Sequence, residues 1–353
     1  MIAVRQSTLL RSLAIVVAAA LILLLLSGEL SAYRQLQLAE GTYFFAVLAG
    51  LTMLIGLSGQ VSLGHGAFLC VGAYTVSLLI ADEGWALAPA IAAAVVVSCL
   101  IGLPVGAAAS RLRGPYLAGA TLAFAVGLPA LGDKFPSLFD GENGLTINPP
   151  AVPSWLGANF SLEHWQAWIG CVGGLIVLFV LLNLYRSGLG RSFRAVRDDE
   201  IAAALCGLRV GRMQTLAFVI SAGCAGLGGG IYAAVLNLAT PSAFSLTLSL
   251  SLLTGAVVGG LGSLTGAVWG AALLVLLPNW SNDIAHSLSL SGNVSDNLPQ
   301  AIYGVVLIVV MLAWPSGLQG GVRALVGSAR ARWGGNGGNE AKRIESPEGG
   351  GEK

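Results

Sequence analysis

Two long stretches without a charged residue limit what this chain can fold into. The first covers residues 42–81 and the second covers residues 244–278, and neither contains Asp, Glu, Lys or Arg. A helix needs about 20 mostly apolar residues to cross a bilayer. Each stretch is too long for a single crossing, so each predicts two membrane-spanning helices with a break between them.

Six further apolar segments raise the expected number of spans to ten. Of the 353 residues, 55% are apolar and only 10% are charged, whereas a soluble chain carries about 25% charged residues. Such a chain cannot cover a water-facing surface, which excludes a soluble enzyme, a secreted disulfide scaffold and a disordered protein. We therefore expect an all-α, polytopic helical membrane protein of about ten transmembrane helices with short breaks. The six segments are 13–30, 85–109, 115–131, 165–185, 213–236 and 299–314.

The placement of basic residues predicts that both termini are cytoplasmic. Lys and Arg concentrate on the cytoplasmic side of membrane proteins. With ten spans and the N-terminus inside, four basic clusters fall in the cytoplasm, and before the tail only Arg34 and Lys134 fall outside. The alternative for the N-terminus is a cleavable signal peptide, which would leave nine spans. The clusters are Arg5/Arg11, Arg111/Arg113, the group within 186–212, and Arg323/Arg330/Arg332.

The chain divides into one membrane domain and a tail. Residues 1–333 form the predicted permease-like domain, with an outer loop at 133–163 that is rich in Pro, Gly and Asn. Within this loop, the run from Asp140 to Gly144 reads Asp-Gly-Glu-Asn-Gly and predicts a cluster of turns. Residues 334–353 are rich in Gly and Glu with few apolar residues, so we expect a disordered cytoplasmic tail.

No energy source is encoded in the chain itself. The centres of the assigned spans contain no Asp, Glu, Lys or Arg, and none of the three lysines lies in a GxxxxGK[ST] motif. Neither GxSxG nor HExxH is present, so we expect no enzyme activity and no cofactor. The five cysteines form no CxxC pair and predict no metal site. With a net charge of +1, we expect no nucleic-acid partner. A partner must then supply energy, although an ion site lined by backbone would escape this argument.

The loop at 186–212, called the coupling loop below, predicts a short helix at the membrane surface. Gly188 and Gly190 are expected to break the preceding helix. Asp198 or Asp199 can cap a new one, because an acidic side chain accepts hydrogen bonds from free N–H groups at a helix start. Residues 200–206 then form a helix with small residues at its centre, which Gly207 ends. Small residues let another protein approach closely, so this helix is a candidate docking site. The alternative is an ordinary charged loop between two spans.

Glycine-rich segments fall at both predicted breaks. Paired breaks of this kind often line a transporter's pathway, because freed backbone groups face a cavity. Tight turns or close helix packing are the alternative. His65 is the ionisable group nearest a span centre; it can bind a substrate or hold neighbouring backbone. The candidate pathway residues are Gly59, Gln60, Ser62, Gly64, His65, Gly259, Gly260 and Gly262.

Several motifs together resemble one family. In the coupling loop, residues 200–208 read EIAAALCGL and fit ExAAxxxGL, which looks like the coupling motif of ABC importer permeases. The wider run GRSFRAVRDDEIAAALCGLRVGRMQTLAFVISAGCAGLGGGIYA (190–233) is similar to the permeases of branched-chain amino acid importers. The length of the chain and the closing WPSGL resemble the longer of that family's two paired permease types. Similar segments lie at 51–75, 112–124, 141–145, 257–274 and 303–318.

This resemblance implies an architecture with several partners. The chain would be the translocation subunit of an ATP-driven importer in the bacterial inner membrane, moving branched-chain or other hydrophobic amino acids by alternating access. It implies a heterodimer with a related permease, two cytoplasmic ABC ATPases that bind ATP and Mg²⁺, and a periplasmic substrate-binding protein. The ATPase would contact the helix that starts after Asp199, through Glu200, Ala202, Ala203 and Gly207.

Two departures from the family pattern leave the substrate open. Residues 125–129 read Ala-Val-Gly-Leu-Pro where an acidic or polar residue is expected, and Cys206 precedes the glycine of the coupling motif. An importer of urea or short amides is therefore the first alternative. A stand-alone ion-coupled carrier is the second, and a purely structural membrane subunit is the third.

Overall fold

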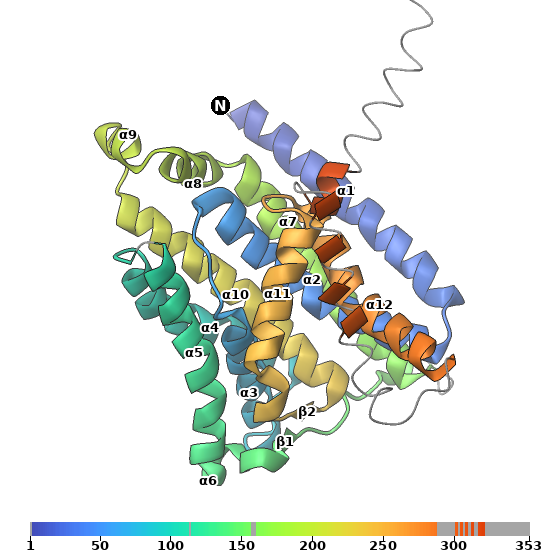
Figure 1. The fold of residues 1–353 in the computed structure, drawn as a ribbon. Helices are drawn as coiled ribbons and strands as arrows, with labels where there is room; N and C mark the ends of the chain where they lie inside the picture. Colours follow the sequence, from blue (N-terminus) through green and yellow to red (C-terminus); the bar gives the residue numbers. More distant parts are fainter. Residues whose placement is uncertain are drawn as a thin grey trace, which may run out of the picture.

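The computed structural model describes residues 2–112, 114–156, 160–287, 301–302, 304–305, 308–309, 312–313 and 317–321. Within these residues the chain is almost entirely helical (Figure 1). Six helices are long and apolar enough to cross a membrane, and three shorter apolar helices accompany them. The predicted span 299–314 contains only scattered described residues. The basic cluster Arg323/Arg330/Arg332 and the tail at 334–353 lie outside the described residues.

Nine apolar helices match nine of the ten predicted spans, and the predicted all-α membrane fold is confirmed. Both uncharged stretches are divided as expected, because residues 59–64 separate α2 from α3 and residues 260–263 separate α11 from α12. The nine are α1 (Ile2–Glu29), α2 (Ala32–Ser58), α3 (His65–Ala81), α4 (Leu87–Ala109), α5 (Pro115–Lys134), α7 (Leu162–Arg186), α10 (Val210–Leu236), α11 (Leu246–Gly259) and α12 (Leu264–Ser287).

Short elements mark the two ends of the bundle (Figure 1). At one end, here called the α8–α9 end, lie α8 (Gly188–Asp198) and α9 (Glu200–Leu205). At the opposite end, β1 (Leu145–Thr146) pairs antiparallel with β2 (Leu238–Ala239). Asp140, Gly141 and Gly144 all have positive φ, as the predicted cluster of turns requires. This second end also holds α6 (Pro136–Phe139), η1 (Gly141–Asn143), η2 (Ser154–Leu156) and η3 (Pro241–Phe244).

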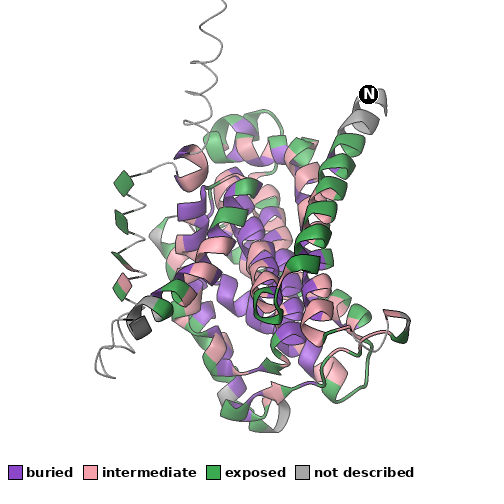
Figure 2. Ribbon diagram, turned by 90° about the vertical axis from the view of Figure 1, so that its right-hand side faces the viewer, coloured by how far each residue is buried: buried purple, intermediate pink, exposed green. Residues whose placement is uncertain are grey.

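The helix α10 occupies the centre of the bundle, packed against α2, α3 and α4. Its glycines set how closely these helices approach. A Cβ at Gly226 would overlap Ser98 of α4, and a Cβ at Gly229 would overlap the carbonyl of Leu69 in α3. Membrane helices gain van der Waals contact when small residues let their backbones come together. This stripe therefore builds the core, and burial is concentrated in the same central helices (Figure 2).

The helix α1 lies outside this core. Only 6% of its apolar window is buried, against 78% for α2 and α10. It packs mainly against α7, where the Arg186 guanidinium donates to Ser12 Oγ (3.3 Å) and Trp168 Nε1 donates to Ser27 Oγ (3.3 Å). Among the described residues α7 is thus the main neighbour of α1, and Gln35 of α2 adds a hydrogen bond from its Nε2 to the Ser27 carbonyl (3.2 Å).

Candidate functional site

The short helix predicted in the coupling loop is present as α9, and Asp199 caps it. The Asp199 carboxylate accepts hydrogen bonds from the backbone N–H groups of Ile201 (2.8 Å) and Ala202 (3.0 Å). These are two of the four N–H groups at a helix start that lack a partner within the helix. Asp198 takes no part in the cap, since it ends α8 and pairs with Arg197.

Gly207 ends α9 in the left-handed conformation, with φ +84°. The N–H of Gly207 donates to the Ala204 carbonyl (2.9 Å), and the N–H of Leu208 donates to the Ala203 carbonyl (3.0 Å). These two bonds form a Schellman motif, for which glycine at this position is favoured. A helix of six residues is therefore fixed at both ends.

The two faces of α9 differ. Ala202 is exposed, whereas Ala203 is buried (4% exposed), so these two predicted contact residues lie on different faces of α9. Ile201 and Leu205 are 75% and 85% exposed, although both are large apolar residues. Sequence reasoning missed this pair; their spacing of four residues on an exposed helix was the available signal. An exposed apolar pair on a rigid helix is suited to contact with another protein.

The preceding helix α7 ends at Arg186, next to Gly188 and Gly190, as expected, but the two glycines also belong to a helix that the sequence did not predict. They begin a helix, α8, whose N-cap is Ser187: Ser187 Oγ accepts a hydrogen bond from the Gly190 N–H (3.2 Å). A Cβ at Gly190 would overlap the Leu184 carbonyl, so glycine lets α8 fold back on the end of α7. The Ser cap and this close approach outweigh the low helix propensity of glycine.

The break between α2 and α3 enters the bundle from the α8–α9 end (Figure 1). Gly59 closes α2 with φ +73°, and its N–H donates to the Ile55 carbonyl (3.0 Å). Further along, the N–H of Leu63 donates to Thr121 Oγ1 (3.0 Å), and the N–H of Gly64 donates to Ser62 Oγ (3.2 Å). Side chains therefore satisfy backbone groups that no helix or strand pairs.

His65 joins this break to the central helix α10. Its Nδ1 lies 3.0 Å from Ser62 Oγ and its Nε2 lies 2.7 Å from Ser221 Oγ. The side chain is 1% exposed and packs beside Phe68 and Phe218. Both ring nitrogens thus lie within hydrogen-bond distance of hydroxyl groups of the chain itself, so the partners are serine side chains and not the neighbouring backbone weighed from the sequence.

The last turns of α2, just before the first break, contact the second break, which is the turn from α11 to α12. A Cβ at Gly56 would overlap the backbone of Gly262, whose N–H donates to the Thr52 carbonyl (3.3 Å). Gly260 and Gly262 have positive φ, at 119° and 73°, and form the turn from α11 to α12. Gly259 packs tightly against Gly266 of α12. The end of α2 and the α11–α12 turn are thus held against each other.

Arg197 connects α8 to this contact. Its Nη1 donates to the Gly56 carbonyl (2.5 Å), while Nε and Nη2 bind the Asp198 carboxylate (2.9 and 2.6 Å). The residue belongs to the helix immediately before α9, so one guanidinium bridges the coupling loop and the end of α2. Nothing in the local sequence indicates this bond, which depends on how the helices pack.

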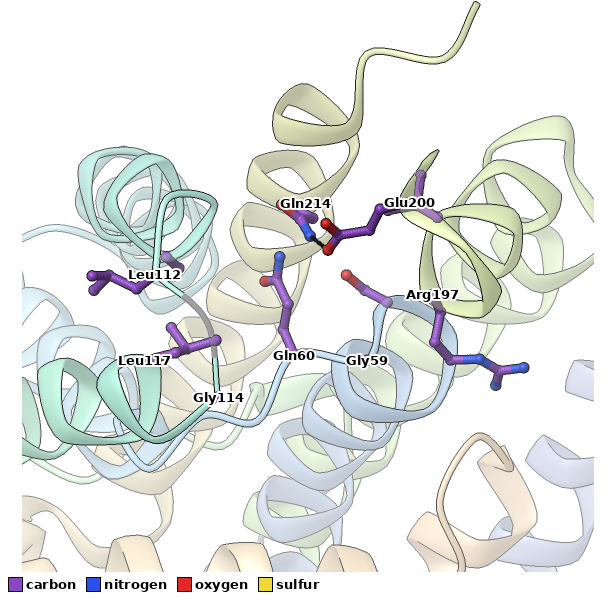
Figure 3. Close-up of a pocket in the computed structure, with 11 residues that line it drawn as sticks. Gly59, Gln60, Leu112, Gly114, Leu117, Arg197, Glu200 and Gln214 are labelled. Carbon is purple, nitrogen blue, oxygen red and sulfur yellow. Dashed lines mark hydrogen bonds between the residues drawn. The ribbon is translucent and has the colours of Figure 1, made fainter. Parts of the chain in front are cut away.

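A polar cavity of about 280 Å³ lies between α9 and the α2–α3 break (Figure 3). Gln60 is 5% exposed, and neither its Nε2 nor its Oε1 has a hydrogen-bond partner among the described residues. Ser58 Oγ is also buried without a partner. Across the cavity, Gln214 Nε2 donates to the Glu200 carboxylate (2.9 Å), and the Gln60 side chain points toward this pair. The cavity thus offers unsatisfied polar groups to water or to a passing solute.

The predicted pathway residues separate into two groups. Gly59 and Gln60 line the cavity, together with Glu200 of α9. The remainder do not line it and instead form the His65 hydrogen-bond cluster or the α11–α12 turn: Ser62, Gly64, His65, Gly259, Gly260 and Gly262. Among the described residues, no three His, Cys, Asp or Glu side chains are grouped so that they could hold a metal ion.

A multi-helix membrane bundle with interrupted spans and a capped surface helix has the architecture of a polytopic membrane permease. The family described as "Branched-chain amino acid transport system / permease component" matches residues 36–314, and the chain belongs to this family. It is 31% identical over 310 residues to the high-affinity branched-chain amino acid transport permease LivM of Salmonella typhimurium, covering 80% of this chain and 69% of LivM.

Other relatives carry similar descriptions. The chain is 27% identical to the permease LivH of Escherichia coli, covering 79% of this chain and 92% of LivH. It is 26% identical to BraD of Pseudomonas aeruginosa, covering 80% of this chain and 93% of BraD. Both are named as high-affinity branched-chain amino acid transport permeases. The similarity to LivM agrees with the longer permease type expected from the sequence. No solved structure matches the chain significantly.

Proposed function

We propose that this chain is the translocation subunit of an ATP-driven importer for branched-chain or other hydrophobic amino acids in a bacterial inner membrane. Family membership supports this function, as do the names of LivM, LivH and BraD. The observation that carries the proposal is α9: a capped helix with exposed Ile201 and Leu205, set beside an interrupted span.

The α8–α9 end faces the cytoplasm in this proposal, and both termini lie on that side. Two ATPase subunits, which hold ATP and Mg²⁺, dock on α9 and on its counterpart in a related permease. A periplasmic binding protein delivers the solute to the opposite end. The concentration of Arg in the coupling loop supports this orientation.

Movement of α9 reaches the spans by two hydrogen-bonded connections. One runs from Glu200 to Gln214 at the start of α10, and the other runs from Arg197 to the Gly56 carbonyl of α2. A displacement of α9 changes both, so the state of the ATPase can bias the positions of α2 and α10. The cavity at Gln60 lies between the two connections and forms the cytoplasmic mouth of the pathway.

Uptake measurements test the substrate and the energy source together. Cells with and without the gene are supplied with labelled leucine or labelled urea, before and after ATP depletion. We expect gene-dependent leucine uptake that stops on ATP depletion. Gene-dependent uptake of urea alone would show that the substrate is urea and not an amino acid. Leucine uptake that persists without ATP would favour an ion-coupled carrier acting alone.

Purification in mild detergent tests the partners. An ATPase subunit should copurify with the wild-type chain. The variant Leu205→Asp should lose the ATPase, because it places a charge on the exposed apolar face of α9. The matched control is Leu189→Asp, at a less exposed apolar position of α8 (42%). Equal recovery of the ATPase with both variants would reject α9 as the docking helix.

A further inference from the structure

An apolar groove of about 700 Å³ lies between α1, α2, α7 and α12. Each helix contributes residues spaced three or four apart, so one face of each helix lines it. On α2 this face carries Arg34, Gln37, Leu38, Gly41, Thr42 and Phe45.

The groove is polar at one end only. Arg34, Gln37 and Trp280 lie where α2 begins and α12 nears its end, whereas Phe45 and Val268 lie deeper along the spans. Because α2 starts at Ala32, this polar end is at the level of a membrane surface. Trp280 is 58% exposed there, which fits the enrichment of Trp at membrane interfaces.

Arg34 is a cation without a partner. It is exposed and makes no hydrogen bond or ion pair with any described residue. In the orientation proposed above, it is also one of two basic residues before the tail that fall on the outer side, where Lys and Arg are disfavoured. An unpaired guanidinium above an apolar groove matches a ligand with a negative head and a hydrocarbon tail.

We propose that this groove binds an anionic phospholipid of the outer leaflet. One acyl chain lies along the apolar walls, and the phosphate accepts hydrogen bonds from the Arg34 guanidinium, whose planar fork suits phosphate oxygens. Gln37 offers a further amide donor at the same level. A neutral helix of a partner protein would fill the apolar walls but leave Arg34 unpaired, which favours the lipid as occupant.

The test is native mass spectrometry of the full chain, delipidated in mild detergent and titrated with phosphatidylglycerol. We expect one lipid to bind the wild type. Arg34→Gln should bind at least about tenfold more weakly, since a charge-assisted bond is lost. The control, Lys134→Gln, removes the other outer cation, at the end of α5 and away from the groove, and should bind as the wild type does.

A second variant tests binding of the acyl chain separately from binding of the headgroup. A Cβ at Gly41 would meet no atom within 4 Å, so a side chain can leave the backbone there, and Gly41→Leu places its larger side chain in the groove that Gly41 lines. It should abolish lipid binding while Arg34 stays in place. Arg34→Lys keeps the charge and should retain part of the binding; a melting temperature close to the wild-type value establishes that each variant is folded.

Three outcomes would overturn the proposal. One is phosphatidylglycerol binding that Arg34→Gln and Gly41→Leu leave unchanged. Another is competition by inorganic phosphate that Gly41→Leu does not affect, which would make Arg34 a simple anion site. The third is a second copy of the chain, or a co-expressed related permease, that occupies the groove and excludes the lipid. Lipid binding is measured without transport, so its failure leaves the proposed function untouched.

Discussion

The α-carbon of Gly56 in α2 packs directly on the backbone of Gly262 in the turn between α11 and α12. The contact leaves no space for a methyl group. Since Gly262 also donates to the Thr52 carbonyl and Arg197 donates to the Gly56 carbonyl, three segments meet at this point. The coupling loop is thereby connected to both interrupted regions of the membrane domain.

Enlarging Gly56 should separate these segments. We expect Gly56→Ala to lower the free energy of unfolding by about 1–3 kcal/mol, the usual cost of overpacking a tight interior contact. Thermal unfolding in detergent measures the change. Gly119→Ala in α5 is the control, because its Cβ would enter open space. Equal melting temperatures for the two variants would show that the Gly56 contact can relax without cost.

Removing the cap of α9 should loosen that helix without affecting the spans. Asp199→Ala leaves the N–H groups of Ile201 and Ala202 without their acceptor and should cost about 1 kcal/mol of helix stability. Hydrogen exchange at these two amides should accelerate, and uptake per molecule should fall. Asp199→Asn should retain most of both properties. Asp198→Ala keeps the cap and serves as control; an identical exchange rate in it and in Asp199→Ala would contradict this account.

A bulky residue at Gly207 should uncouple transport from ATP hydrolysis. The φ of +84° is unfavourable for a side chain, at a cost of about 1–2 kcal/mol. The strain affects the end of α9 and not its surroundings, because a Cβ there would meet no neighbouring atom. We expect Gly207→Val to insert normally and to lose uptake, while Gly211→Ala in α10 retains it. Wild-type uptake by Gly207→Val at equal membrane abundance would disprove the prediction.

The His65 hydrogen bonds should contribute to stability. His65→Ala leaves the buried Ser221 hydroxyl without this partner, and a buried group that loses its hydrogen bond costs about 1–3 kcal/mol. Combining His65→Ala with Ser221→Ala should cost less than the sum of the single changes, because the pair acts together. If His65 binds the substrate instead, the melting temperature will stay constant while the KM of uptake rises.

Sequence patterns predicted the elements that depend on local chemistry. The division of both uncharged stretches follows from length, and the two ends of α9 follow from Asp199 and Gly207. The features that the sequence did not predict depend on how the helices pack. α8 was not anticipated, because its glycines indicate a break until the close approach at Leu184 is known. Burial of the spans was not predicted either, although hydropathy carried a signal: the mean hydropathy is 2.8 for the little-buried α1 and 1.7 for the largely buried α2.

The packing of α1 mainly on α7 has a consequence for biosynthesis. Chains enter the membrane from the N-terminus onward, so α1 is in place before α7, its main neighbour, has been made. During that interval Ser12 lacks its bond to Arg186, and Ser27 lacks its bond to Trp168. Until α7 has been made, α1 is therefore bordered by lipid and by the start of α2, whose Gln35 binds the Ser27 carbonyl, and the docking of α1 on α7 is a late step in assembly.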